Sequence, residues 1–327
     1  AANNSDIIFK GTDDGADITM LTLDGSAAGE ATFNAAVIAT SFVTTSLGTS
    51  NFIAGLGSGA AIESGGNDNV IIGSNAADAA TTADNTIAIG HDAIGAGELT
   101  GTDNTAIGQK AGEDLTSGAY NVMVGHEAGT NATTATKNVA IGLNAMHGQP
   151  SVGAVTGISN VAIGENAGYT LTTGASNVFV GFGAGEKATS ANNTIAIGRY
   201  ALGLGELAGA DNTAIGQYAG YDLTDGTHNN FIGYGAGFNA TTASNAIAIG
   251  TLAMGVGELT GDNNIGIGRQ AGNDLTNGAY NVMVGYQAGT NVTTGADNTI
   301  LGPSAGDALT TGSNNTIIGH DAAASAV

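Results

Sequence analysis

The chain has 327 residues, of which 55 are glycine, two are proline and none is cysteine or tryptophan. Its formal charge of −22 repels phosphate backbones and anionic membrane surfaces, so we expect no nucleic-acid partner. No apolar run approaches the ~20 residues that a membrane span needs, so we expect no membrane insertion. The lack of cysteine excludes disulfides, cysteine nucleophiles and cysteine-ligated zinc. A hydrophobic content of 42% argues against a disordered chain. We therefore expect the many glycines to occupy turns of a regular structure.

The first 50 residues stand apart from the rest of the sequence because they contain no repeat. Short strands are predicted at 6–10, 18–23 and 30–33, separated by turns at 12–16 and 24–28. We expect residues 1–50 to form an attachment or capping region, since a repeat array needs a cover over its open end.

Residues 51–327 carry a repeat of the form Asn-x-x-[Ile/Val]-Gly. Successive glycines of the motif are 17 or 18 residues apart, with one interval of 22. They are Gly55, Gly73, Gly90, Gly108, Gly125, Gly142, Gly164, Gly181, Gly198, Gly216, Gly233, Gly250, Gly268, Gly285, Gly302 and Gly319. This period predicts an all-β fold, a parallel β-solenoid (β-roll) of about sixteen coils, roughly 75 Å long at ~4.8 Å per coil.

Other positions recur once per coil, and we call each such set a column. An alanine follows the motif glycine by three residues, as at Ala111 and Ala219, where only a small side chain is expected to fit. A threonine follows it by eight in most coils, and we expect the Thr and Asn columns to form hydrogen-bonded ladders of identical side chains. A second glycine, as at Gly112 and Gly185, predicts a turn with positive φ. Coils also group in threes, with equivalent positions 52 residues apart, as for Asn160 and Asn212.

The strand of each coil is apolar on both faces, so both faces need cover. Val122 and Val124 are predicted to face the interior of their own coil. The intervening Met123, with Phe179, Phe231 and Met283 at equivalent positions, is predicted to face neighbouring chains, because a coil of 17 residues has little room inside. We therefore expect a homotrimeric rod; a single wider solenoid without a partner is the alternative.

The coils, with Asn104 to Gly112 as an example, resemble the head repeats of trimeric autotransporter adhesins and similar repeats in bacteriophage tail and capsid fibres. The opening residues 6–11, with 21–24 and 31–34, are similar to segments of fibre-like phage proteins. The resemblance covers residues 51–319 and implies three parallel β-rolls wound side by side.

Nothing in the sequence predicts an enzyme, a cofactor or a metal site. The acidic pairs Glu113–Asp114 and Asp13–Asp14 are expected to be a solvated rim rather than a glycosidase pair. The five histidines share no column, which argues against a metal ladder. Asp and Asn at coil junctions, as in 262–264, fit turn chemistry better than calcium binding.

Two features could recognise a ligand. Aromatic residues follow the motif glycine closely and could hold sugar rings, although packing between chains is the commoner use; they are Tyr169, Phe182, Tyr200, Tyr218, Tyr221, Tyr234, Phe238 and Tyr286. The interval of 22 residues places four extra residues in a loop from His147 to Gly157, and such insertions often touch partners.

The preferred hypothesis is a structural and adhesive fibre, a rigid trimeric spacer that presents a host- or surface-binding region. Its partners would be two further copies of itself, other virion proteins and a cell-surface glycan or protein; its location would be a virion or a bacterial surface. An ice-binding or carbohydrate-binding adhesin and a polysaccharide depolymerase on a β-helix are the alternatives.

Overall fold

The computed structural model describes residues 7–13, 16–23, 31–33, 50–62, 66–149, 151 and 153–323. Contacts divide the chain into two units, Ala1–Val43 and Thr44–Val327. The described part contains strands and turns and no helix.

The first unit holds a three-stranded antiparallel sheet in the order β1-β2-β3. Its strands are β1 (Ile7–Asp13), β2 (Ala16–Leu23) and β3 (Ala31–Phe33). All three overlap the strands expected in residues 1–50, but β1 and β2 run into the predicted turn at 12–16 because the two strands stay paired as far as Asp13 and Ala16. A capping role for this region stays a prediction.

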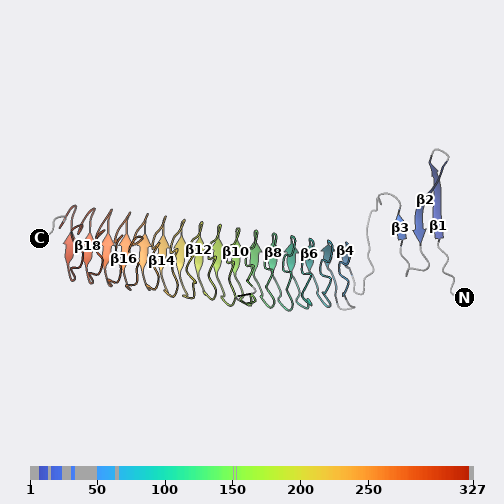
Figure 1. The fold of residues 1–327 in the computed structure, drawn as a ribbon, viewed down its shortest axis with the longest axis horizontal. Coiled ribbons are helices and arrows are strands. Elements are labelled where there is room, and N and C mark those ends of the chain that lie inside the picture. Colours follow the sequence, from blue (N-terminus) through green and yellow to red (C-terminus); the bar gives the residue numbers. More distant parts are fainter. Residues whose placement is uncertain are drawn as a thin grey trace. The chain divides into compact units, whose positions relative to one another are not determined.

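The second unit is a parallel β-solenoid with one three-residue strand per coil (Figure 1). Sixteen strands form a single sheet in sequence order, and each pairs in register with the same positions of the next coil, as Val161 does with Val178. The strands are β4 (Phe52–Ala54), β5 (Val70–Ile72), β6 (Ile87–Ile89), β7 (Thr105–Ile107), β8 (Val122–Val124), β9 (Val139–Ile141), β10 (Val161–Ile163), β11 (Val178–Val180), β12 (Ile195–Ile197), β13 (Thr213–Ile215), β14 (Asn230–Ile232), β15 (Ile247–Ile249), β16 (Ile265–Ile267), β17 (Val282–Val284), β18 (Thr299–Leu301) and β19 (Thr316–Ile318). The predicted solenoid fold is confirmed.

The motif glycine ends every strand for two reasons that Gly125 illustrates. Its φ of 139° lies where side chains are strained. A Cβ on this residue would also lie 2.4 Å from the carbonyl oxygen of Gly142 in the next coil. The stacking distance of the sheet therefore leaves no room for any other residue.

A ladder of asparagines runs inside the solenoid, as the sequence predicts. Asn177 is fully buried and donates from Nδ2 to Oδ1 of Asn160 in the preceding coil at 3.0 Å and to the carbonyl of Ala191 at 2.6 Å. Its own Oδ1 accepts from the backbone N–H of Thr194 in the following coil at 3.0 Å. Each asparagine thus satisfies backbone groups of two coils, which fixes the register between them.

The threonine column behaves differently from the predicted side-chain ladder. Five of its hydroxyls donate to the backbone carbonyl of the next threonine, as Thr172 does to Thr189 at 2.9 Å. The same bond joins Thr116 to Thr133, Thr224 to Thr241, Thr276 to Thr293 and Thr293 to Thr310. These hydroxyls are therefore engaged within the stack.

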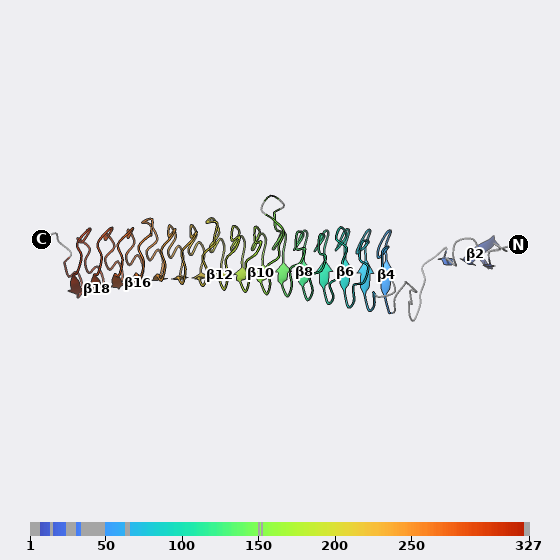
Figure 2. The same cartoon turned by 90° about the horizontal axis from the view of Figure 1, so that it is seen from below.

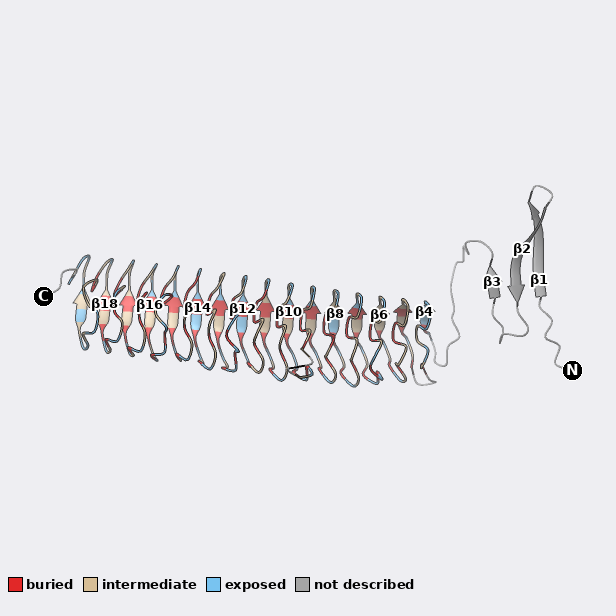
Figure 3. Cartoon of the chain, viewed as in Figure 1, coloured by how far each residue is buried: buried red, intermediate tan, exposed pale blue. Residues whose placement is uncertain are grey.

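Buried residues recur in every part of the stack of coils (Figure 3). The alanine column is completely buried from Ala76 to Ala305, as at Ala111 and Ala219. The predicted orientation of the strands is wrong. Met123, Phe179, Phe231 and Met283, expected to face neighbouring chains, point into the coil and are at most 2% exposed. Their neighbours Val122 and Val124, expected inside, lie on the outer face of the sheet, where Val122 is exposed.

The room for these large side chains comes from the second glycine. Phe179 lies between Gly168 and Gly185, where added Cβ atoms would be 3.0 Å and 2.7 Å from its ring. Both glycines have φ near 60°, as the sequence predicts for this column. Four coils with Ala in mid-strand carry a large residue in the second-glycine column; these residues are Ile94, Met146, Leu202 and Met254. The coils of Ala106, Ala162 and Ala214 keep the glycine, so both of their positions are small. A coil that is small at both positions lies between a coil with a large mid-strand residue and a coil with a large residue in the second-glycine column. The large side chains of these two neighbours fill the space beside the small residues, which explains the grouping in threes.

Candidate functional site

The first candidate surface is the outer face of the sixteen-stranded sheet, which we call the strand stripe. It consists of the first and third residues of strands β4 to β19, because successive strand residues point to opposite faces. Isoleucines in the third position are exposed by 36–38% along the rod; they are Ile107, Ile141, Ile163, Ile197, Ile215, Ile232, Ile249 and Ile267. The stripe is therefore an open, regular apolar surface.

The composition of the strand stripe is uniform. Its third positions are apolar in every strand, from Ala54 to Ile318, and neither position ever holds a charge. Polar residues occur only in first positions, at Thr105, Thr213, Asn230, Thr299 and Thr316. Exposed apolar surface that continues over so many coils is typical of an interaction face.

The second candidate surface is a cluster of aromatic side chains on the turns that follow the strands. The rings of Tyr200 and Tyr218 are stacked with centroids 5.9 Å apart, and Tyr221 meets both edge to face. Phe182, Tyr234 and Phe238 extend the cluster to neighbouring coils. The guanidinium carbon of Arg199 lies 5.3 Å from the ring centre of Tyr200, a cation–π contact. Most of the aromatics named from the sequence therefore meet one another within a single chain.

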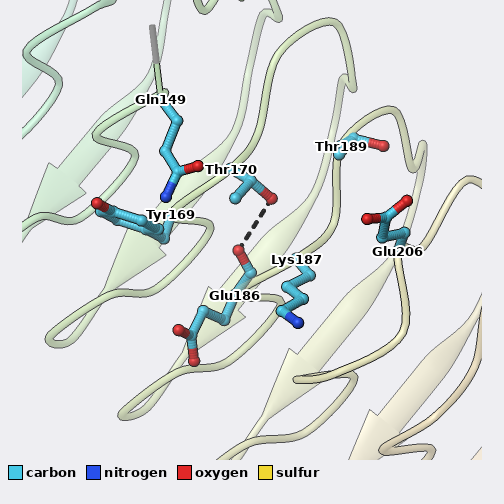
Figure 4. Close-up of a pocket in the computed structure, with 7 residues that line it drawn as sticks. All are labelled: Gln149, Tyr169, Thr170, Glu186, Lys187, Thr189 and Glu206. Atoms are coloured by element: carbon cyan, nitrogen blue, oxygen red, sulfur yellow. Dashed lines mark hydrogen bonds between the residues drawn. The ribbon is translucent and has the colours of Figure 1, made fainter. Parts of the chain in front are cut away.

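A pocket of about 270 Å³ lies next to this cluster and beside the inserted loop (Figure 4). Four successive coils line it, with Gln149 and Tyr169 at one end, Thr189 and Glu206 at the other, and Lys187 between them. Thr170 and Glu186 complete the lining. In Figure 2 the loop that contains Gln149 projects from the solenoid on the side away from the row of strands.

Burial changes the acid–base behaviour of two carboxyl groups in this region. Desolvation raises the pKa of Glu186, and the nearby Lys187 ammonium opposes that shift. Desolvation also raises the pKa of Asp222. The pKa of the Tyr221 hydroxyl is raised by burial first and by the charge of Asp222 second. Both carboxyl groups are therefore partly withdrawn from water.

Of the two acidic pairs considered for catalysis, the structure describes Glu113–Asp114. Glu113 is engaged by Lys110, whose Nζ lies 3.1 Å from its Oε1. Desolvation and the charge of Glu113 raise the pKa of Asp114. Asp14 lies outside the described residues, as does the side chain of Asp13.

Two of the junction carboxylates accept hydrogen bonds from backbone groups of the adjacent coil. Asp84 accepts from the N–H of Asn67 at 2.7 Å, and Asp262 accepts from that of Ser244 at 2.8 Å. Among the described residues there is no group of three His, Asp or Glu side chains that could hold a metal ion. The same residues include no helix long and apolar enough to cross a membrane.

Sequence reasoning named Tyr169 and the loop containing Gln149, and the structure brings them together. It missed Glu186, Lys187, Thr189 and Glu206 as neighbours of that loop. No protein-family model, curated protein or solved structure matches the chain.

Proposed function

We propose that this chain is a structural fibre protein, a rigid homotrimeric spacer that presents a binding region away from the surface carrying it. The observation that supports this function is the strand stripe. An uncharged apolar stripe that runs through all sixteen strands is costly to leave in water, so it favours a partner with an equally long and regular surface. A second and a third copy of the same chain carry an identical strand stripe and therefore have such a surface.

The interior of the solenoid suits a spacer. Each coil contacts only its neighbours, and the buried asparagine ladder ties every coil to the next by side-chain hydrogen bonds. Sixteen strands at ~4.8 Å give a length of roughly 75 Å. Three such rods joined along their stripes would bend less than one rod alone. The location that fits this role is a virion fibre or a bacterial surface.

The association is tested by two substitutions in the centre of the strand stripe, Ile195→Asp and Ile197→Asp in one variant. Both side chains are exposed by 36–38%, so a single folded chain tolerates the charges, whereas an interface would bury them unpaired. Analytical ultracentrifugation should give three times the chain mass of 31.7 kDa for the wild type and a smaller mass for the variant.

Leu204→Asp provides the matched control, because Leu204 is exposed by 44% but lies outside the strands. This control should retain the wild-type mass. A wild-type protein that sediments as a single chain at micromolar concentration would overturn the proposed association, and a dimer would overturn the trimer.

A further inference from the structure

We infer that the pocket beside the inserted loop binds one pyranose unit of a neutral glycan, with the next units of that glycan lying along the neighbouring aromatic cluster. The inference deepens the proposed function, since it places the binding region of the fibre within this chain. It rests on four features of the site: an aromatic ring held in place, a mixed set of hydrogen-bonding groups, the continuity of rings beyond the pocket, and the uniqueness of this coil.

The aromatic wall is Tyr169. Its ring stacks on His147 of the preceding coil with centroids 5.2 Å apart and an interplanar angle of 26°. His147 is itself positioned by Glu127, whose Oε2 lies 3.5 Å from its Nε2. A half-exposed ring fixed from behind offers its free side to the C–H face of a sugar at little entropic cost.

The polar groups of the pocket match hydroxyl groups, which both donate and accept hydrogen bonds. Lys187 donates, Glu206 and Glu186 accept, and Gln149 and Thr189 can do either. The hydroxyl of Thr170 is already used, since it donates to the carbonyl of Glu186 at 3.0 Å. A volume of about 270 Å³ lies at the lower end of ligand pockets and suits one sugar unit rather than a larger ligand.

The aromatic surface continues from the pocket along the rod. A Cβ added to Gly183 would lie 2.5 Å from the ring of Tyr200 and 3.0 Å from a carboxylate oxygen of Glu186. Glu186 thus borders both the pocket and the cluster. Beyond Tyr200 follow Tyr218 and Tyr221, so further sugar units of a bound chain would meet rings on the next coils.

The charge of the site argues for a neutral ligand. Glu186 and Glu206 outnumber the single Lys187, and the whole chain carries a formal charge of −22. An anionic glycan would be repelled on approach and within the pocket. A neutral sugar avoids that repulsion and uses the carboxylates as acceptors.

The coil that carries His147 departs from its equivalents at the site. The position of His147 is occupied by Gly95, Gly203 and Gly255 in the three equivalent coils. A ring of the preceding coil also supports Phe238, which stacks on Tyr221. At Tyr169 this support comes from His147 and is combined with an inserted loop that supplies Gln149. A fibre of identical coils would present the same surface everywhere, whereas this irregularity creates one distinct place.

Isothermal titration calorimetry with four hexasaccharides tests the inference: cellohexaose, maltohexaose and hexa-N-acetylchitohexaose as neutral probes and hexagalacturonate as the anionic one. At least one neutral probe should bind and the anionic probe should not. Tyr169→Ala should weaken that binding about tenfold, because aromatic contacts contribute up to ~1.5 kcal/mol. Gln149→Ala, a change at a half-buried loop residue outside the core, should weaken it several-fold.

Tyr286→Ala is the matched control, since Tyr286 packs over Arg269 on a distant coil, and it should bind like the wild type. Failure of all three neutral probes to bind, binding of hexagalacturonate alone, or unchanged affinity of both pocket variants would overturn the inference. Sedimentation of the same samples separates this result from the proposed function: a trimer that binds no sugar refutes the pocket alone, while a single chain that binds sugar refutes the fibre alone.

Discussion

Phe179 fills the interior of its coil because residue 185 has no side chain. A Cβ on Gly185 would lie 2.7 Å from two atoms of the Phe179 ring, closer than nonbonded carbon atoms approach. Phe231 and Gly237 repeat the same relationship 52 residues later, again at 2.7 Å. The aromatic residue and the glycine therefore form one packing unit that was duplicated together.

This coupling predicts a non-additive double-mutant cycle. Gly185→Ala should lower the free energy of unfolding by about 1–3 kcal/mol through overpacking, with about 1 kcal/mol more because φ is 59° at this position. Phe179→Ala should cost about 3–5 kcal/mol through the cavity that it leaves. In the Phe179→Ala background, Gly185→Ala should cost only the backbone contribution. Urea unfolding followed by circular dichroism measures all four proteins, and strictly additive losses would contradict the packing unit.

The same relationship explains what sequence reasoning could and could not predict. The sequence predicts the glycine, alanine and asparagine columns because in each of them one structural constraint acts on one residue. Examples are the positive φ of Gly125 and the burial of Ala111. The sequence does not predict the direction in which the Phe179 side chain points, because that direction depends on the absence of a side chain six residues later, at Gly185. Apolar residues on both faces of the strand left two orientations open, and the estimate of interior room ignored the second glycine.

For the candidate pocket, the sequence identified the residues with distinctive chemistry and length. Tyr169 is aromatic, and Gln149 belongs to the one long interval. Glu186, Lys187 and Glu206 are ordinary surface types in any single coil. They become neighbours only through the register of four coils. Aligning the coils on the motif glycine and reading the columns five to eight residues after it would have brought them together.

The asparagine ladder should be the most sensitive polar feature of the rod. Asn177→Leu removes one donor group and one acceptor and leaves the N–H of Thr194 and the carbonyl of Ala191 buried without these partners. Unsatisfied buried groups cost ~1–3 kcal/mol each, so the free energy of unfolding should fall by at least about 2 kcal/mol. Asn177→Thr should cost less, because Thr86 and Thr194 already occupy this column.

Asn230 serves as the control for this experiment, since it is an exposed asparagine on the outer face of β14. Asn230→Leu should change the urea midpoint little. If Asn177→Leu is equally mild, the ladder does not stabilise the stack, and register comes from the backbone and glycine columns alone.

Asp222 should make the rod less stable at neutral pH than at mildly acidic pH. Desolvation raises the pKa of Asp222 in the folded state above its unfolded value, so the folded chain binds this proton more tightly. The contribution of Asp222 to the free energy of unfolding is therefore greatest at pH values below its unfolded pKa of about 3.9. This contribution is lost as the pH rises through the higher pKa of the folded state. Asp222→Asn should raise the melting temperature at pH 7 and change it little near pH 4.

Asp225→Asn tests whether the effect is specific, because it removes the same formal charge from an exposed side chain three residues away. We expect this control to shift the melting temperature at pH 7 by less than Asp222→Asn. Equal shifts would assign the effect to the overall negative charge instead of the desolvation of Asp222.

The inserted loop should be dispensable for folding but needed for recognition. Val155 after the insertion is fully buried, and its N–H donates to the carbonyl of Asn131. Gly157 accepts from the ladder residue Asn138. These two positions belong to the core path of the coil, whereas the four extra residues fall between His147 and Val155. Replacing residues 148–154 by Ala-Gly-Glu, the sequence of the equivalent segment 96–98, removes only the extra length.

The trimmed chain should melt within about 2 °C of the wild type, because loops of this kind carry little of the stability of a fold. It should nevertheless bind the neutral hexasaccharide less well, since Gln149 leaves with the loop. Any adhesion of the wild type to glycan-bearing cells should fall with it. A large loss of melting temperature would instead make the loop a structural bracket between the coils that precede and follow it. Adhesion that persists unchanged after trimming would move recognition to residues 1–50 or to a partner protein at the tip.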